Sequence, residues 1–288
     1  MREDGEFFVA VPSPDPALTE LALAAALKAA DIICDIYSRP IEAITKLDGS
    51  PVTQADQAAE QAILAMLAPT GIPVLAEESV AAGIVPELGD RYFVVDPLDG
   101  TKEFIKRNGE FAVNIGLVEA GIPVMGVIVA PVTGAIYMAD ASGAWFCRRQ
   151  GGILTPRQPM AVSQAKRPCI VASRSHGHAA LAELRRILDV ASDVSVGSSL
   201  KFGLLAHGEA QLYPRFTPTC EWDTAAGQAI VEAAGGAVIT LDGARLSYGK
   251  REAGFLNPFF VAAASLDLAQ RTAGEMRRLL GSAASHAT

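Results

Sequence analysis

Apolar residues recur at helical spacing near the start of the chain. From Leu18 to Tyr37 they fall three and four residues apart, and the pattern ends before the next proline. This spacing predicts a first helix with one buried face. A second helix is predicted from Thr53 to about Leu67, because Thr53 and Asp56 form a capping-box pattern with Asp in place of the usual Glu. Segment 41–47 between them fits either a short strand or the end of the helical layer.

Short runs rich in β-branched and aromatic residues follow, and they predict strands. The expected strands cover residues 73–76, 91–96, 111–119, 123–130 and 135–139. Because no helix pattern separates the last three runs, we predict an antiparallel sheet. Pro97 cannot donate a ladder hydrogen bond, so we expect the strand before it to stop at Asp96.

After Gly151-Gly152 and a polar stretch, strands and helices alternate. The expected elements are strands 169–173, 193–196 and 210–213, helices 179–188, 198–206 and 223–234, and a final amphipathic helix 266–280. Alternation of this kind is typical of an α/β unit. We therefore predict two lobes, an α+β lobe over residues 1–160 and an α/β lobe over 161–288, with the boundary near 155–165.

Composition narrows the function classes. The chain has 288 residues, half of them hydrophobic, and its net charge of −8 follows from 24 basic and 32 acidic residues. This balance excludes the basic footprint of a duplex nucleic-acid binder. If the substrate is an anion, metal ions must supply the positive charge.

The cysteines and the apolar runs indicate the compartment. Four cysteines lie far apart without a C-x-x-C pair, which favours a reducing environment. Neither a basic signal-peptide opening nor an apolar run of about 20 residues is present, so no transmembrane segment is expected. We predict a cytoplasmic protein.

One turn places two carboxylates directly after an apolar strand. Asp96 and Asp99 stand three residues apart, Gly100 permits a close backbone approach to a ligand, and Thr101 offers a hydroxyl at a predicted helix start. These hard oxygen donors, with the Leu98 carbonyl, favour magnesium or manganese over zinc. The turn therefore predicts a divalent-cation site that faces a phosphate.

Two further acidic clusters have a functional and a simpler interpretation. Glu77 and Glu78 follow a predicted strand, where an ordinary solvated loop is the default interpretation. Asp223 precedes a predicted helix, where an aspartate is commonly an N-cap. From the residues alone, both alternatives stay open.

Three motifs stand in the order found in a known family. They are Glu77-Glu78-Ser79, Asp96-Pro97-Leu98-Asp99-Gly100-Thr101 and Trp222-Asp223-Thr224-Ala225-Ala226-Gly227. The chain resembles the inositol monophosphatase superfamily of magnesium-dependent, lithium-sensitive phosphatases. It is similar in particular to the bacterial 3'(2'),5'-bisphosphate nucleotidase branch, which serves sulfate assimilation. This narrower resemblance rests on segments 48–53, 102–111, 173–176, 197–202 and 211–216.

The resemblance implies a layered αβαβα sandwich with a two-metal site. The metal ligands would be Glu77, Asp96, the Leu98 carbonyl, Asp99 and Asp223, with Asp96 shared by both ions. Two or three Mg²⁺ ions are implied, with Mn²⁺ as a substitute. Such a pair of ions can hold an attacking water and a leaving oxygen in line across one phosphorus.

The same resemblance assigns roles around the reacting phosphate. Asp48, Thr101 and Glu77 would act on the nucleophilic water. The residues expected to contact the reacting phosphate are Glu77, Leu98, Asp99, Gly100, Thr101 and Asp223. Gly49 departs from the branch pattern, where Asn is usual, and Cys220 beside the Asp223 motif fits either a redox-sensitive neighbour or an inert thiol.

Substrate choice is expected from the second lobe. The candidates for a second phosphate and ribose hydroxyls are Ser173, Arg174, His176, Ser198, Ser199, Lys201 and Arg215. The alternative for Ser198 and Ser199 is that they only cap a helix. The alternative for His176 is a polar loop residue that is hydrogen-bonded within the protein and does not contact the substrate. A simple monoester such as inositol monophosphate has no second phosphate that Arg174, Lys201 and Arg215 would bind.

From these expectations we predict a phosphatase that removes the 3'-phosphate of adenosine 3',5'-bisphosphate (PAP) to give AMP. A further expected substrate is 3'-phosphoadenylyl sulfate (PAPS), which would give adenylyl sulfate. The alternatives are an inositol or sugar monophosphatase and a non-catalytic metal and nucleotide sensor. The sequence leaves open monomer or homodimer, and the resemblance adds a peripheral position on the cytoplasmic face of the inner membrane.

Overall fold

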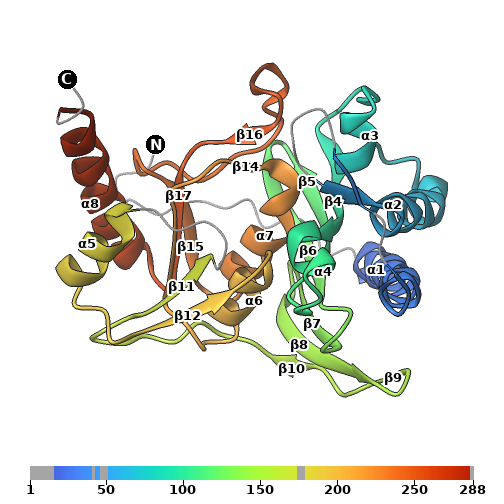
Figure 1. The fold of residues 1–288 in the computed structure, drawn as a ribbon, viewed down its shortest axis with the longest axis horizontal. Coiled ribbons are helices and arrows are strands. Elements are labelled where there is room, and N and C mark those ends of the chain that lie inside the picture. The colour runs from blue at the N-terminus through green and yellow to red at the C-terminus, as the bar shows by residue number, and fades with distance from the viewer. Residues whose placement is uncertain (1–15, 41–42, 46–50, 174–178, 286–288) are drawn as a thin grey trace.

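The computed structural model describes residues 16–40, 43–45, 51–173 and 179–285 (Figure 1). Both long N-terminal helices follow the predicted pattern: α1 covers Pro16–Tyr37 and α2 covers Gln54–Leu67. Thr53 caps α2, and the Asp56 carboxylate accepts its backbone amide at 2.8 Å, which completes the predicted capping box. Segment 43–45 is a short strand, β1, paired with β2 (Pro51–Thr53).

The first sheet carries the predicted antiparallel strands. Its order is β10-β8-β7-β6-β5-β4-β3, with β9 on β8 and a parallel pairing only between β3 and β4. The bounds are β3 Val74–Ala76, β4 Arg91–Asp99, β5 Ala112–Glu119, β6 Ile122–Val129, β7 Ala135–Asp140, β8 Gly143–Gln150, β9 Ile153–Leu154 and β10 Gln158–Pro159. Strands β8, β9 and β10 were not predicted.

The second sheet has the order β12-β11-β13-β17-β15, parallel around β11 and antiparallel from β13 onward. Its strands are β11 Cys169–Ser173, β12 Ser192–Val196, β13 Leu212–Arg215, β15 Ala237–Thr240 and β17 Phe260–Ala263. The helices of this half are α5 Ala179–Ile187, α6 Leu200–Ala206, α7 Ala225–Ala233 and α8 Leu266–Ser285. The predicted alternation is thus confirmed.

Five layers result, as Figure 1 shows. Helices α1 and α2 pack on the outer face of the first sheet, and α5 and α8 pack on the outer face of the second. Helices α6 and α7 lie between the sheets in one core that joins Ile128 and Tyr137 to Phe202, Ile230 and Phe260. The expected αβαβα sandwich is confirmed, whereas the division at residue 160 stays a prediction.

Two glycines allow α7 to lie very close to the first sheet. A Cβ added at Gly126 on β6 would stand 2.2 Å from the Ala226 carbonyl oxygen, and one at Gly116 on β5 would stand 3.0 Å from the Ala225 Cβ. Real atoms cannot approach so closely, so only glycine fits at Gly126 without a shift of the helix. This packing sets the height of α7 above β5 and β6.

The strand before Pro97 is longer than expected. Strand β4 continues to Asp99, and its pairing with β5 shifts register between Asp96 and Asp99. Pro97 and Leu98 together oppose the single residue Val113, so a bulge absorbs the proline without ending the strand. The prediction that β4 stops at Asp96 was therefore wrong.

Two local assignments also change. Glu77 and Glu78 begin the short helix α3 (Glu77–Ala81), not a solvated loop. Asp223 closes a 3₁₀ turn (Glu221–Asp223), and Thr224, not Asp223, is the N-cap of α7. A short α4 (Thr101–Ile105) begins at Thr101 after Gly100 at φ 99°, as the sequence predicted.

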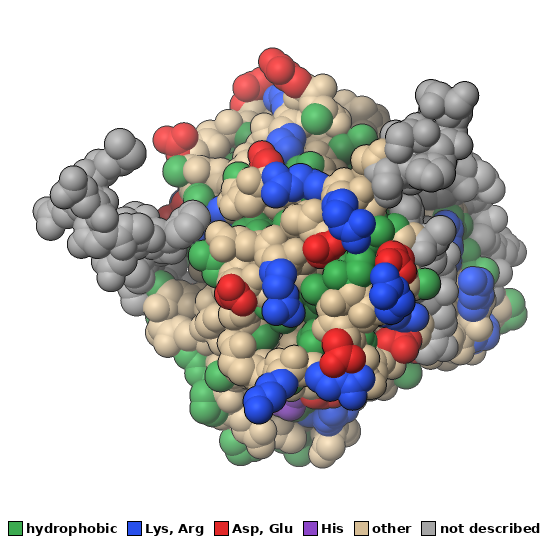
Figure 2. Space-filling view, turned by 90° about the vertical axis from the view of Figure 1, so that its left-hand side faces the viewer, with side chains coloured by type: hydrophobic (Ala, Val, Ile, Leu, Met, Phe, Trp, Pro, Cys, Tyr) green, Lys and Arg blue, Asp and Glu red, His purple; other side chains and the backbone are tan. Residues whose placement is uncertain are grey.

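The face over α5 and α8 mixes both charge signs (Figure 2). Arg186 pairs with Glu183 on α5, and Arg278 pairs with Glu275 on α8. Basic side chains on this face therefore do not gather into one patch of the kind that binds duplex nucleic acid. None of the helices in the described ranges is both long and apolar enough to cross a membrane.

The close approach of α7 predicts a strong effect of one methyl group. Gly126→Ala should lower the free energy of unfolding by about 1–3 kcal/mol, because the new Cβ meets backbone that cannot move aside cheaply. Urea unfolding followed by circular dichroism measures it. Gly274→Ala in α8 is the control, since nothing lies within 4 Å of its Cβ position. It should be neutral or stabilising. A Gly126→Ala protein as stable as the wild type would contradict this packing.

Candidate metal and phosphate site

The β4 bulge brings two carboxylates to the end of the first sheet. Asp96 is 1% exposed, and its Oδ1 accepts the Leu98 amide at 2.9 Å. Asp99 lies beyond the bulge, where its Oδ2 accepts the Ser199 amide. Two residues of β4 oppose one residue of β5 at the bulge. For this reason the side chains of Asp96 and Asp99 both line the same cavity.

Helix α7 brings the third carboxylate from the other half of the chain. Asp223 lies two residues before the first residue of α7, and its Oδ2 accepts the Cys220 amide at 2.7 Å. Carboxylate oxygens of Asp96, Asp99 and Asp223 all lie within 4.8 Å of one another. The structure thus brings together three of the acids that the sequence predicted as metal ligands.

Burial and mutual repulsion make this cluster unfavourable as three free anions. Burial raises the pKa of Asp96 well above its ordinary value, and the nearby Glu77, Asp99 and Asp223 raise it further. Burial, then Asp99 and Glu77, raise the pKa of Asp223 to about 7. A bound divalent cation would offset this repulsion. Because all the donors are hard oxygens, the residues fit magnesium or manganese.

Asp99 is held by the second half of the chain as well as the first. Asn114 on β5 donates to Asp99 Oδ2 at 3.4 Å and accepts the Ser199 hydroxyl at 2.6 Å. Asn114 and Ser199 are both almost completely buried. The Ser199 hydroxyl therefore faces Asn114, and its role as a substrate contact stays a prediction.

Thr101 has a partner that the sequence did not identify. Its hydroxyl lies 3.0 Å from Asp56 Oδ1 and 3.4 Å from the Leu98 carbonyl oxygen. The other oxygen of Asp56 accepts the amide and the hydroxyl of Thr53. The sequence predicts Asp56 only as part of a helix cap. The residues next to Asp56 in the sequence do not indicate that it also binds Thr101.

Glu60 is a second residue that the sequence analysis missed. It is 4% exposed on α2, and its carboxylate accepts the Glu78 amide at 2.8 Å and the Ser79 amide and hydroxyl at 2.8 and 2.6 Å. These contacts fix the start of α3, the helix on which Glu77 stands. The i, i+4 spacing of Asp56 and Glu60 on α2 was the one available signal.

A single cavity of about 250 Å³ joins the acids to residues from the second half. Its predicted members are Glu77, Asp96, Leu98, Asp99, Gly100, Thr101, Ser198, Ser199, Lys201, Arg215 and Asp223. It is also lined by residues that were not proposed individually, namely Pro51, Lys102, Glu103, Gly197, Tyr213, Thr219 and Thr224. Asp48, Arg174, His176 and the Ser173 side chain lie outside the described residues.

Two cations line the same cavity as the acids. Lys201 is buried at 3% exposure, donates to the carbonyls of Val196 and Ser198, and lies 5.4 Å from the Tyr213 ring centre. Burial lowers its pKa to about 8, although Asp99 acts in the opposite direction. Arg215 donates to the Thr217 and Pro218 carbonyls. The cavity therefore offers both a cation site and an anion site.

The fold and these motifs define the class of protein. The chain belongs to the inositol monophosphatase family, whose family model matches residues 16–279.

Its relatives narrow the comparison. The 3'(2'),5'-bisphosphate nucleotidase CysQ of Shigella flexneri is 48% identical over 240 residues, which are 82% of this chain and 95% of the relative. The crystal structure of CysQ from Bacteroides thetaiotaomicron is 40% identical, with a TM-score of 0.72 over 86% of this chain and 97% of that one. A Thermotoga maritima IMPase, 21% identical, shares the fold with a TM-score of 0.74 over 93% of this chain and 99% of that one.

The raised pKa of Asp223 predicts a pH-dependent stability. In the unfolded chain an aspartate ionises near its ordinary pKa of 3.8, whereas folded Asp223 keeps its proton to about 7. The unfolding free energy of metal-free protein should therefore fall as the pH rises between these values. Magnesium should reduce the fall, because the ion binds ionised carboxylates.

Urea unfolding over a pH series, in chelator and in magnesium, measures this effect. Asp223→Asn cannot ionise and should show a shallower dependence in chelator. If wild type and Asp223→Asn lost stability equally over this range, Asp223 would not be the buried acid responsible.

Proposed function

We propose that the protein is a magnesium-dependent phosphatase that removes the 3'-phosphate of PAP to give AMP and inorganic phosphate, and that it also converts PAPS to adenylyl sulfate. One observation carries this proposal: the acid cluster and the two cations line the same cavity. A substrate with a reacting phosphate and a second anionic group suits that arrangement. The bisphosphate nucleotidase relatives are named for an activity on such a substrate.

The metal ligands in this proposal are Asp96, Asp99, Asp223, Glu77 and the Leu98 carbonyl. Bound there, magnesium ions would neutralise phosphate charge and lower the pKa of a water molecule. The protein supplies the fixed geometry. Asp96 is held by the Leu98 amide, Asp99 by the Ser199 amide and Asp223 by the Cys220 amide, each through one oxygen. The second oxygen of each carboxylate remains for a cation.

Thr101 and Asp56 would orient the attacking water. A hydroxyl has one proton to donate and two lone pairs to accept with. When Thr101 donates its proton to Asp56, its oxygen can only accept, so a water in the cavity must point a hydrogen at Thr101. The proton can then pass through the Thr101 oxygen toward the Asp56 carboxylate. Asp48 remains a further candidate for this step.

Lys201 and Arg215 would bind the second anionic group. Both line the cavity close to Tyr213. Inositol monophosphate has no second anionic group to place against these two cations. This difference favours a nucleotide bisphosphate over a simple monoester.

The Thr101 hydroxyl predicts a sharp contrast between two small substitutions. Thr101→Val keeps the shape but removes the hydroxyl, and should lower kcat by about 100-fold or more. Thr101→Ser keeps the hydroxyl and should retain most of the activity. Asp56→Asn should resemble Thr101→Val, with little change in KM. Steady-state phosphate release measures all three. Full activity of Thr101→Val would contradict the proposed role of this pair.

A substrate panel tests the proposed activity. Phosphate release from PAP, PAPS, inositol 1-phosphate and a sugar monophosphate is measured with magnesium and with chelator. PAP should give the highest kcat/KM, and chelator should abolish turnover. An Asp99→Asn protein should fold but be nearly inactive, because an amide carries no charge to hold an ion, and it serves as the background control.

Each other outcome points to a named alternative. Faster turnover of inositol 1-phosphate than of PAP would make the protein a monophosphatase. Binding of PAP with magnesium but no phosphate release would make it a sensor. Undiminished turnover in chelator would contradict the metal requirement.

A further inference from the structure

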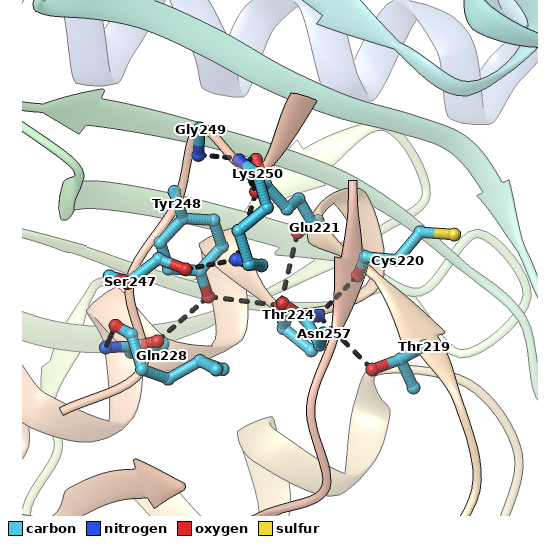
Figure 3. Close-up of polar contacts among 11 residues, drawn as sticks. Thr219, Cys220, Glu221, Thr224, Gln228, Ser247, Tyr248, Gly249, Lys250 and Asn257 are labelled. Atoms are coloured by element: carbon cyan, nitrogen blue, oxygen red, sulfur yellow. Dashed lines mark hydrogen bonds and ion pairs between the residues drawn. The ribbon is translucent and has the colours of Figure 1, made fainter. Parts of the chain in front are cut away.

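A segment far along the chain lies across the turn that carries Asp223. We call residues 219–224 the ligand turn and residues 247–257 the strap. Figure 3 shows them side by side, joined by side chains from both. Strand β14 of the ligand turn (Thr219–Cys220) pairs with β16 of the strap (Leu256–Asn257). None of the strap residues lines the cavity described above.

Glu221 is the centre of these contacts. Its side chain is 0% exposed, although it carries a carboxylate. The carboxylate accepts the amides of Gly249 at 3.0 Å and Lys250 at 2.8 Å, and it forms an ion pair of 3.0 Å with Lys250 Nζ. A fully buried carboxylate with three donors is a strong anchor, and it is costly unless those donors are in place.

Lys250 is held on its own side by the strap. Its ammonium also donates to the Ser247 carbonyl and lies 4.9 Å from the Tyr248 ring centre (Figure 3). The Glu221 amide in turn donates to the Phe255 carbonyl at 2.9 Å. The ion pair and this backbone bond therefore join Glu221 to both ends of the strap.

Asn257 and Tyr248 complete the attachment (Figure 3). The Asn257 amide group lies 2.7 Å from the Cys220 carbonyl oxygen and 2.9 Å from the Thr224 hydroxyl. The Tyr248 hydroxyl lies 3.0 Å from the Thr224 hydroxyl and 2.8 Å from the Gln228 side-chain oxygen. The strap thus bonds residues on both sides of Asp223.

We propose that Glu221 and Lys250 are positioning residues of the metal site, whose ion pair holds the ligand turn so that Asp223 points at Asp96 and Asp99. The pair touches neither substrate nor reacting atoms. It acts through Cys220, whose amide binds the Asp223 carboxylate. The inference rests on the proposed metal site, and it adds residues outside that site on which metal affinity depends.

Two physical accounts of Glu221 predict opposite results for one variant. If Glu221 aided metal binding only through its negative charge, Lys250→Met would remove a nearby cation, and the metal would bind equally or more tightly. If the ion pair positions the ligand turn, Lys250→Met loosens the strap and the metal binds more weakly. Lys250 is 22% exposed, and its replacement by Met keeps the Gly249 and Lys250 amides on Glu221, so it disturbs the buried carboxylate less than Glu221→Gln does.

The test measures metal binding directly. Mn²⁺ is titrated into chelator-treated protein, and free Mn²⁺ is followed by electron paramagnetic resonance. Glu221→Gln and Lys250→Met should each raise the dissociation constant about 10-fold, as is usual when a group that orients a metal ligand is removed. Under saturating metal, kcat and the KM for PAP should return to near the wild-type values.

Glu232→Gln is the matched control. Glu232 is a largely buried acid, 18% exposed, that pairs with Arg245 at the other end of α7. Its replacement should lower thermal stability and leave Mn²⁺ affinity unchanged. Wild-type or tighter Mn²⁺ binding by Lys250→Met, or wild-type binding by Glu221→Gln, would overturn the proposal. Because Mn²⁺ binding requires no substrate, a failure of PAP hydrolysis would not obscure this result.

Discussion

The close contact between α7 and the first sheet is the constraint on which the site depends. Gly116 and Gly126 let the backbone of α7 approach β5 and β6 more closely than any side chain would allow. Asp223 stands two residues before this contact, and Asp96 and Asp99 stand on the adjacent strand β4. A thicker interface would carry Asp223 away from its two partners. The acid cluster is therefore a product of backbone packing as much as of residue identity.

That packing collects negative charge where water is largely excluded, and the surrounding structure is arranged to hold it. Backbone amides bind one oxygen of each carboxylate, and Lys201 lines the same cavity. The same arrangement keeps the other oxygens in place before any cation arrives. The clustered carboxylates thus lower the stability of the fold locally, but the site needs little rearrangement when a cation binds.

Local sequence patterns predicted what depends on neighbours in the chain. The capping box of Thr53 and Asp56 and the alternation of the second half required no knowledge of tertiary structure, and both are confirmed. The end of strand β4 was predicted wrongly from Pro97, because a bulge can accommodate a proline that a regular strand ladder cannot. Family motifs located Asp96, Asp99 and Asp223 in order along the chain. Their proximity is a finding of the structure.

Other parts of the site could not be predicted in this way. Asp56 meets Thr101 across 45 residues, and Asn114 meets Ser199 across 85. Such pairs are set by how layers stack, which no spacing rule reports. Strand β8 was missed because its apolar residues come together at 144–147 and Arg148 and Arg149 follow, so polar and apolar residues do not alternate. Residues that act through others, such as Glu60, leave no signature of their own.

The division of the acid cluster between β4 and the start of α7 has a consequence for how the molecule matures. During synthesis, Asp96 and Asp99 emerge more than a hundred residues before Asp223, and the strap that braces the ligand turn emerges later still. A partly made chain therefore lacks a complete cation site. The three acids come together only when both sheets have closed on the middle helices.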